Sequence, residues 1–328
     1  MIKNLLRKIL LTLTPILWGG PAIAQDSVTT APPSATSADP KAKVPDIDTL
    51  KKVPEKNTSK KDADPALWVL KDKDTTIYMF GTVHILKPGL SWFDSAVKDA
   101  FDNSDNLVLE LVTPDAATSQ KIFGKYAIDK SGKSLRDKLS ADERTRYEKA
   151  LADLGFPANS FDALKPWAVG MTLQLVALSK DKFDVNSGVE QQLSSAAKAS
   201  KKPISGVETM QGQLKIFDTL SQDRQVKFLM ETVDEMGSLA DNMDKMVDYW
   251  AAPDPEKLGD LMNQGFDDPQ LYDALLTKRN SAWARWINER MKKPGTVFMA
   301  VGAGHLAGPT SVQNLLSAYG LKAERVAY

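Results

Sequence analysis

The sequence predicts an α/β fold, in which a mixed β-sheet core is built from two strand–GxxH units that frame a large, mostly helical insertion. The first observation is in residues 77–84, where an apolar run of β type ends in a glycine and a histidine follows three residues later. Residues 296–305 repeat this arrangement near the other end of the chain. Between them, apolar residues recur at helical spacing. Strand-like ends around a helical middle are typical of a sheet that helices cover.

The two strand–GxxH units contain the only two histidines of the chain, His84 and His305. Gly81 and Gly302, three residues before them, are expected to end the strands in sharp turns at positive φ, which glycine adopts without strain. Ligands of open α/β sheets bind beyond the carboxyl ends of the strands, so both imidazoles are predicted to reach one crevice. The alternative is that both are core histidines satisfied within tight turns.

The first 65 residues are predicted to lie outside the folded domain. Residues 1–24 combine basic residues, a short apolar stretch and a final Ala-Ile-Ala, which is typical of a secretory signal peptide cleaved after Ala24. Residues 25–65, rich in Pro, Ser, Thr, Ala, Lys and Asp, are interpreted as a disordered linker. The mature protein is therefore predicted to be exported, into the periplasm of a bacterium. No other stretch has the apolar length of a membrane helix.

Residues 66–328 have the composition of one large domain. The precursor carries 42 basic and 42 acidic residues, and loss of the signal peptide makes the balance slightly negative. Nothing in that balance indicates nucleic-acid binding. The chain has no cysteine, so it can form no disulfide and offers no thiol for covalent catalysis or a lipid anchor.

The elements of this domain are predicted in order from periodicity and capping signals. A β-hairpin of residues 67–70 and 76–80 leads into the first glycine, and a helix with Ser91 as its N-cap runs to about residue 103. Residues 106–112 form a short apolar strand that carries Glu110. The elements predicted after it are a capping-box helix at 140–154, helices at 166–178, 211–220, 222–236, 241–251, 255–263, 280–291 and 310–319, a short strand and turn at 202–209, and strands at 296–301 and 323–327.

Glu110 is the charged residue of an apolar strand, where it must be paired, hydrogen-bonded or bound to a metal. A position at the exposed edge of the sheet is the alternative. Two imidazoles and one carboxylate leave open positions on a divalent ion for water and substrate. Glu208 is a candidate general base or further ligand. Arg279 is a candidate for stabilising a developing oxyanion, with a salt bridge at the start of a helix as the alternative.

Motifs spread over the chain, taken together and in order, resemble those of the TraB/GumN family, which includes bacterial pheromone-shutdown proteins and the animal Tiki metalloproteases. The matching segments are residues 80–84, 109–111, 206–209, 279–283 and 301–308. The resemblance covers residues 67–326 and implies that His84, Glu110 and His305 form a metal and catalytic centre. It also matches Arg279 to the Arg of an Arg-Asn element. One departure is Glu190, where many relatives have Asp.

Two hypotheses about function follow and stay open. The first is a periplasmic metal-dependent hydrolase of peptide or related amide bonds, with Mn, Co or Zn as the divalent ion. The second is a non-catalytic periplasmic protein that sequesters a peptide or glycan in the same crevice. A role near exopolysaccharide production, which the GumN name suggests, has no support in the residues. The chain lacks an HExxH helix and a G-x-S-x-G elbow, so the mechanisms that these motifs indicate are not predicted.

Overall fold

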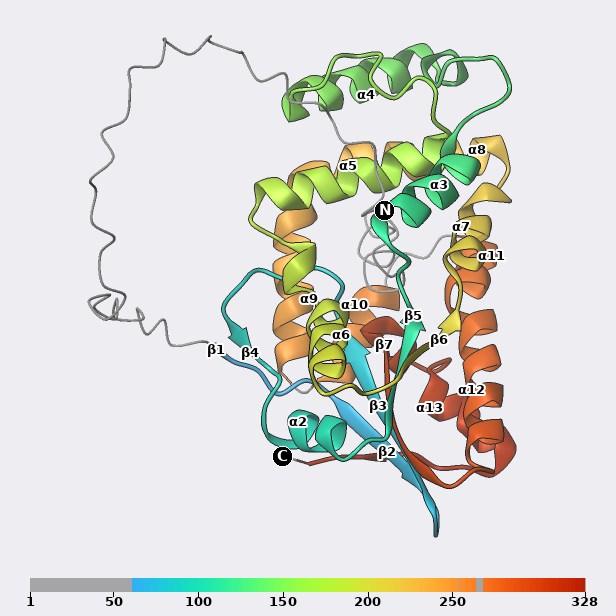
Figure 1. Ribbon diagram of the computed structural model, residues 1–328. Coiled ribbons are helices and arrows are strands. Elements are labelled where there is room, and N and C mark those ends of the chain that lie inside the picture. Colours follow the sequence, from blue (N-terminus) through green and yellow to red (C-terminus); the bar gives the residue numbers. More distant parts are fainter. Residues whose placement is uncertain (1–60, 253, 264–267, 328) are drawn as a thin grey trace, which may run out of the picture.

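The computed structural model describes residues 61–252, 254–263 and 268–327. It contains a six-stranded mixed sheet, which confirms the predicted α/β class (Figure 1). Four neighbouring strands of this sheet run parallel, and the last two, β2 and β8, are each antiparallel to their neighbour. In spatial order the strands are β6 (Ile204–Glu208), β5 (Asn106–Leu111), β7 (Gly295–Gly302), β3 (Thr75–Thr82), β2 (Leu67–Lys71) and β8 (Glu324–Arg325).

The two strand–GxxH units lie side by side in the middle of the sheet. β3 and β7 pair in parallel over eight residues, from Thr75 opposite Gly295 to Thr82 opposite Gly302. β5, the strand that carries Glu110, flanks β7 on its other side. Segments separated by more than 200 residues therefore end at the same edge of the sheet, as the paired motifs predicted.

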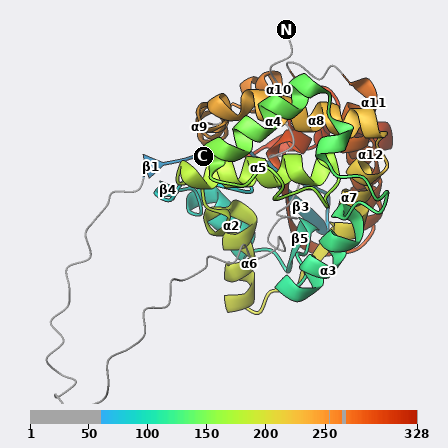
Figure 2. The same ribbon diagram turned by 90° about the horizontal axis from the view of Figure 1, so that it is seen from above.

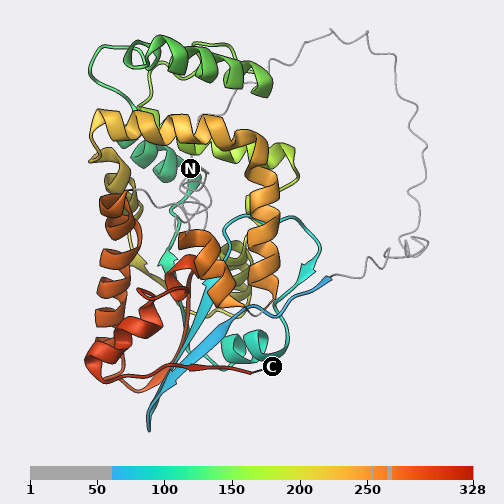
Figure 3. The same cartoon turned by 180° about the vertical axis from the view of Figure 1, so that it is seen from behind.

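Alternating side chains of the central strands fill two separate cores, because successive residues of a strand point to opposite faces. On one face Val297, Met299 and Val301 pack against α12 (Lys278–Arg290) and α13 (Val312–Leu315). On the other face Phe298 and Ala300 pack with α2 (Ser95–Asp102), α6 (Val189–Ala199) and α9 (Leu239–Ala251). The sheet is thus the middle layer of three, which Figures 1 and 3 show from opposite sides.

The helical insertion lies across the carboxyl ends of the parallel strands, as the view from above shows (Figure 2). Its own cores consist of large side chains such as Trp167, Phe217 and Phe228 around α5 (Pro166–Lys180) and Tyr147 in α4 (Ala141–Leu154). The remaining helices are α3 (Ala116–Ala127), α4 (Ala141–Leu154), α5 (Pro166–Lys180), α7 (Met210–Asp218), α8 (Gln222–Glu235), α10 (Pro255–Asn263) and α11 (Pro269–Tyr272). No helix of the described part of the chain is long and apolar enough to cross a membrane.

The predicted boundaries hold at some elements and fail at others. Ser140 caps α4 and forms the expected capping box with Glu143. The helix predicted to start from Ser91 begins instead at Ser95, with Asp94 as N-cap, so that assignment was wrong. The physical reason is tertiary: Leu90–Ser91 (β4) pairs with Lys61–Asp62 (β1), and Trp92 is drawn into the core.

The first residues of the described chain also correct the predicted linker. The predicted signal peptide and residues 25–60 lie outside the described residues. Residues 61–65, assigned to the linker from composition, are ordered: β1 pairs with β4 and Ala63 is buried. The folded part of the chain therefore includes residues 61–65, the end of the segment that composition alone predicted to be a linker.

Replacing Trp92 by alanine is expected to lower the free energy of unfolding by about 3–5 kcal/mol, since truncating a buried aromatic residue leaves a cavity. Trp92 is 1% exposed, and its ring lies 5.7 Å from that of Phe80 and 6.2 Å from that of Trp250. Urea denaturation measures the change. Tyr319→Ala is the control because Tyr319 is 40% exposed, so a loss of only about 0.5 kcal/mol is expected. Equal losses for both variants would contradict this description of the core.

Candidate active site

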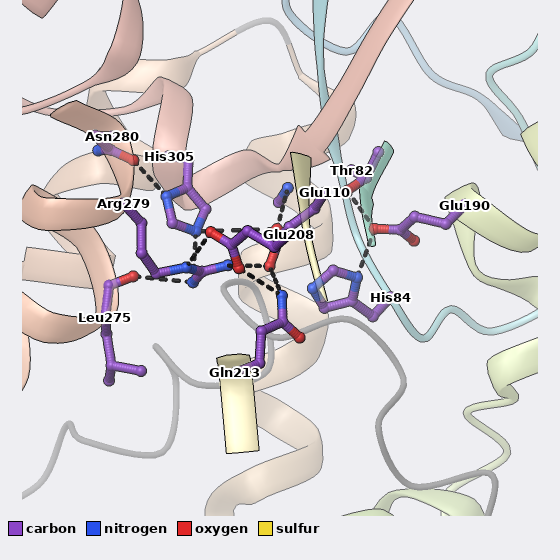
Figure 4. Close-up of polar contacts among 11 residues, drawn as sticks. Thr82, His84, Glu110, Glu190, Glu208, Gln213, Leu275, Arg279, Asn280 and His305 are labelled. Atoms are coloured by element: carbon purple, nitrogen blue, oxygen red, sulfur yellow. Dashed lines mark hydrogen bonds and ion pairs between the residues drawn. The ribbon is translucent and has the colours of Figure 1, made fainter. Parts of the chain in front are cut away.

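Each of the four parallel strands supplies one polar side chain to a single cluster at its carboxyl end. His84 follows β3, His305 lies in the short helical turn after β7, Glu110 is in β5 and Glu208 is the last residue of β6. Arg279 reaches the same cluster from the first turn of α12 (Figure 4). All five residues predicted from the sequence are thus brought together in one place, largely buried between the sheet and the helices above it.

The reason given for the two GxxH glycines was wrong, although their location was right. Neither Gly81 nor Gly302 is among the residues with positive φ, and Gly302 has φ −49°. Gly81 is instead favoured by close packing. A Cβ at this position would lie 3.1 Å from both Cα and Cβ of Ala303, in the turn that carries His305. The absence of a side chain lets the two turns approach each other.

Arg279 is the centre of the cluster. Its Nε donates to Glu208 Oε1 at 2.8 Å, and its Nη2 donates to Glu208 Oε2 at 3.0 Å and also to Glu110 Oε1. Nη1 donates to the Leu275 carbonyl oxygen at 3.0 Å and lies 3.1 Å from His305 Nε2. All five N–H hydrogens of the guanidinium are therefore directed at acceptors. The side chain is 7% exposed and is ion-paired with Glu110 and Glu208 from the first turn of α12, so the alternative of a salt bridge at the start of a helix also fits this position.

Glu110 is fully buried and hydrogen-bonded on both oxygens. Oε1 accepts from Gln213 Nε2 at 2.6 Å as well as from Arg279, and Oε2 accepts from the Gly302 amide at 3.3 Å. Burial raises the pKa of Glu110 to about 7, against the opposing effect of the Arg279 guanidinium. One arginine is therefore not enough to hold this carboxyl group fully ionised at neutral pH. The position excludes the alternative of an exposed sheet edge.

The hydrogen bonds around His305 define its tautomer. Asn280 donates from Nδ2 to the Thr310 carbonyl oxygen at 2.7 Å, so its Oδ1 is the atom that faces His305 Nδ1, 2.5 Å away. Nδ1 therefore carries the proton, and the lone pair of Nε2 accepts from Arg279 Nη1. The ring also lies against Trp283, with ring centroids 4.3 Å apart.

His84 is oriented like His305, with Nδ1 beside an outer partner and Nε2 facing the cluster. Its Nδ1 lies 2.5 Å from Glu190 Oε1, and Thr82 Oγ1 donates to the same oxygen. Nε2 is buried, has no hydrogen-bond partner among the described residues and points toward the Glu110–Glu208 side of the cluster (Figure 4). Burial by itself lowers the pKa of His84, but the Glu190 carboxylate outweighs burial and raises the pKa above its ordinary value.

Four further residues complete the cluster and were not among the predicted site residues: Thr82, Glu190, Gln213 and Asn280. Gln213 had a detectable signal, because it shares the apolar stripe of α7 with Met210, Leu214 and Phe217 and is the polar member of that stripe. Asn280 similarly opens the buried stripe of α12. Glu190 was noted in the sequence only as a departure from a family pattern.

Comparison with known proteins assigns the family. A sequence profile described as the TraB/PrgY/gumN family matches residues 66–325. The chain belongs to this family. Its members with similar sequences include the uncharacterized protein YbaP of Escherichia coli K12, 23% identical over 252 residues, which are 77% of this chain and 92% of YbaP. An uncharacterized protein of Treponema pallidum Nichols is 21% identical over 271 residues, 76% of this chain and 79% of the relative. No solved structure matches.

The donor atoms of this TraB/PrgY/gumN protein fit a divalent ion in their chemistry. Both imidazoles have Nδ1 engaged by an outer partner and Nε2 turned inward, an arrangement typical of histidine ligands of metals. The fully buried Glu110 carboxylate lies between them in the cluster, with Oε2 4.0 Å from His305 Nε2. In the described residues, however, no three acidic or histidine side chains are spaced to hold an ion as they stand. Arg279 occupies the space between Glu110 and His305, so the metal assignment stays a prediction.

Proposed function

We propose that this TraB/PrgY/gumN protein is a metal-dependent hydrolase of peptide or related amide bonds. The observation that carries the proposal is the pair of buried imidazoles with Nδ1 held from outside and Nε2 turned toward one buried carboxylate. His84, His305 and Glu110 would hold a divalent ion such as Mn, Co or Zn. When bound, the ion would supply Lewis-acid chemistry, making a water molecule more acidic and polarising the carbonyl group under attack.

The roles proposed for Glu208 and Arg279 follow from their solvent exposure and their hydrogen bonds. Glu208 is 17% exposed, the most accessible of the site carboxylates, and accepts hydrogen bonds from Arg279 and Gln213. It is therefore the group proposed to take the proton from an attacking water. Arg279 is proposed to donate to the oxygen on which charge develops, for which it must first give up one of its present acceptors.

Metal analysis of the protein, purified without chelators, tests the proposal together with a peptide-library cleavage screen. One divalent ion per chain is expected, along with cleavage that stops when the ion is stripped and returns when it is added back. A protein that binds no metal and cleaves no peptide would contradict the proposal. The export part is tested separately by amino-terminal sequencing of the native protein, which is expected to begin at Gln25.

The competing hypothesis is a binding protein without catalysis. It is favoured by one observation: Arg279 lines an open hollow of about 680 Å³, together with residues of α7 and α11, while the donors behind it are closed to solvent. A peptide or glycan could be held in such a hollow by the other polar side chains that line it, such as Lys215 and Gln270. In the cleavage screen, this function predicts peptides that are retained on the protein and released unchanged.

Replacing Glu190 by glutamine is expected to weaken divalent-ion affinity by about 10–100-fold, as for other outer partners of histidine ligands. The neutral amide still accepts a hydrogen bond but no longer supports His84 with a charge. Isothermal titration calorimetry measures the change, and circular dichroism checks the fold. Glu289→Gln is the control, because the Glu289 side chain is 61% exposed on the far end of α12 and should leave affinity unchanged. Unaltered affinity in Glu190→Gln would show that Glu190 does not act through His84.

A further inference from the structure

Arg279 occupies the acceptor atoms that the proposed metal ion would need. A neutral imidazole nitrogen without hydrogen has a single lone pair. At His305 this nitrogen is Nε2, since Nδ1 faces Asn280, and Nε2 lies 3.1 Å from Arg279 Nη1. The same guanidinium also donates to Glu110 Oε1. An ion bound by His305 and the Arg279 hydrogen bond to His305 therefore exclude each other.

The charges around Arg279 also indicate that a bound ion and the guanidinium exclude each other. Among the described residues, the Arg279 guanidinium pairs with the carboxylates of Glu110 and Glu208, whereas Glu190 pairs with His84. A guanidinium left in place beside a divalent ion would add repulsion between two cations at close range. The arrangement has room for one cation at Glu110 and His305, not for two.

We propose that Arg279 is the resident cation of the metal-free site and that a divalent ion displaces it from Glu110 and His305. This inference rests on the proposed metal-binding function. Glu208 is the second carboxylate partner of Arg279, through Nε and Nη2, and keeps the side chain near the site when its contacts with Glu110 and His305 are lost. The hollow of about 680 Å³ that Arg279 lines provides the space into which the guanidinium turns.

The exchange has a functional consequence. In the metal-free arrangement every N–H of Arg279 is directed at a protein acceptor, so none is available to a substrate. Displacement releases one hydrogen of Nη1 from His305 and one hydrogen of Nη2 from Glu110. Arg279 thus becomes a donor to a substrate carbonyl oxygen only when the ion is present, which makes it a positioning residue in one state and a substrate contact in the other.

Calorimetric titration of Mn²⁺ and Co²⁺ into the metal-free full chain tests the exchange without measuring activity. Arg279→Gln removes the competing cation and is expected to bind the ion at least about tenfold more tightly than the wild type. Arg279→Lys keeps a cation without the fork of hydrogen bonds to Glu208, so it should bind the ion less tightly than Arg279→Gln. Arg285→Gln is the matched control, since Arg285 is an exposed arginine of the same helix, and its affinity should be unchanged.

The outcomes separate this inference from the proposed function. If the wild type binds the ion and Arg279→Gln binds it equally or less tightly, the displacement is wrong while metal binding stands. If neither binds any ion, both proposals fail. If Arg279→Gln does not fold, NMR of the ¹⁵N-labelled wild type tests the displacement instead. The Nε–H signal of Arg279 is identified as the arginine signal that is missing in Arg279→Lys. This signal is expected to shift when the ion is added. A signal that stays in place during saturation with metal overturns the displacement.

Discussion

Replacing His84 or His305 by alanine is expected to abolish divalent-ion binding, and with it any hydrolysis, while the chain stays folded. Each substitution removes Nε2, the nitrogen that faces the site, because Nδ1 is engaged by Glu190 in one case and by Asn280 in the other. Loss of a direct ligand should cost more than the roughly 10–100-fold in affinity that loss of an outer partner costs. Titration calorimetry of the metal-free variants measures the loss.

Stability must be separated from ligation in this experiment, since both histidines are buried. Leu151→Ala is the matched control: Leu151 is fully buried in α4, in a core of the helical insertion that contains none of the site residues. It should lower the free energy of unfolding by about 2–5 kcal/mol and leave the metal affinity unchanged. A histidine variant with wild-type affinity would exclude that histidine as a ligand. Equal loss of binding in Leu151→Ala would attribute the effect to stability.

The location of the site was predictable because it depends on patterns within single strands. A β-type run that ends in GxxH predicts a histidine at the carboxyl end of a strand, and His84 and His305 lie there. An acidic residue in an apolar strand predicts a buried, partnered carboxylate, which describes Glu110. Each of these inferences needs only the period of the strand and the cost of burying a charge.

The partners within the site were not predictable in the same way, because they depend on contacts between distant segments. Nothing near Arg279 in the sequence indicates that its guanidinium lies between Glu110 and Glu208, and Glu190 meets His84 across 106 residues of chain. Strand order belongs to the same class, since β7 inserts between β5 and β3. Pairing of distant segments is decided by the whole core rather than by local preference.

Local signals failed where tertiary packing outweighed them. Ser91 is a good N-cap residue, yet pairing of β4 with β1 and burial of Trp92 delay the helix to Ser95. Position 81 was expected to need glycine because of its backbone freedom. In the structure, glycine is favoured there because a Cβ would crowd Ala303. In both cases the residue type was informative, while the physical cause lay in a contact that the local sequence does not contain.

Replacing Gly188 by alanine is expected to lower the free energy of unfolding by about 1–3 kcal/mol and to weaken metal binding as well. The backbone of Gly188 is ordinary, with φ −60°, so the cost is steric. An added Cβ would lie 2.2 Å from the carbonyl oxygen of His84 and 2.8 Å from its carbonyl carbon, and neither backbone atom can rotate away. Overpacking of this kind forces the backbone to move.

The movement must separate α6 from the turn that carries His84. The Val189 amide donates to the Val83 carbonyl oxygen at 3.0 Å, and Glu190 in the first turn of α6 supports His84, so both contacts are lost together. Gly237→Ala is the control: an added Cβ there meets nothing within 4 Å, and a gain of about 0.4–1 kcal/mol is expected. Urea denaturation and metal titration of the two variants measure both effects. If Gly188→Ala has the wild-type free energy of unfolding and the wild-type metal affinity, α6 does not hold His84 in place.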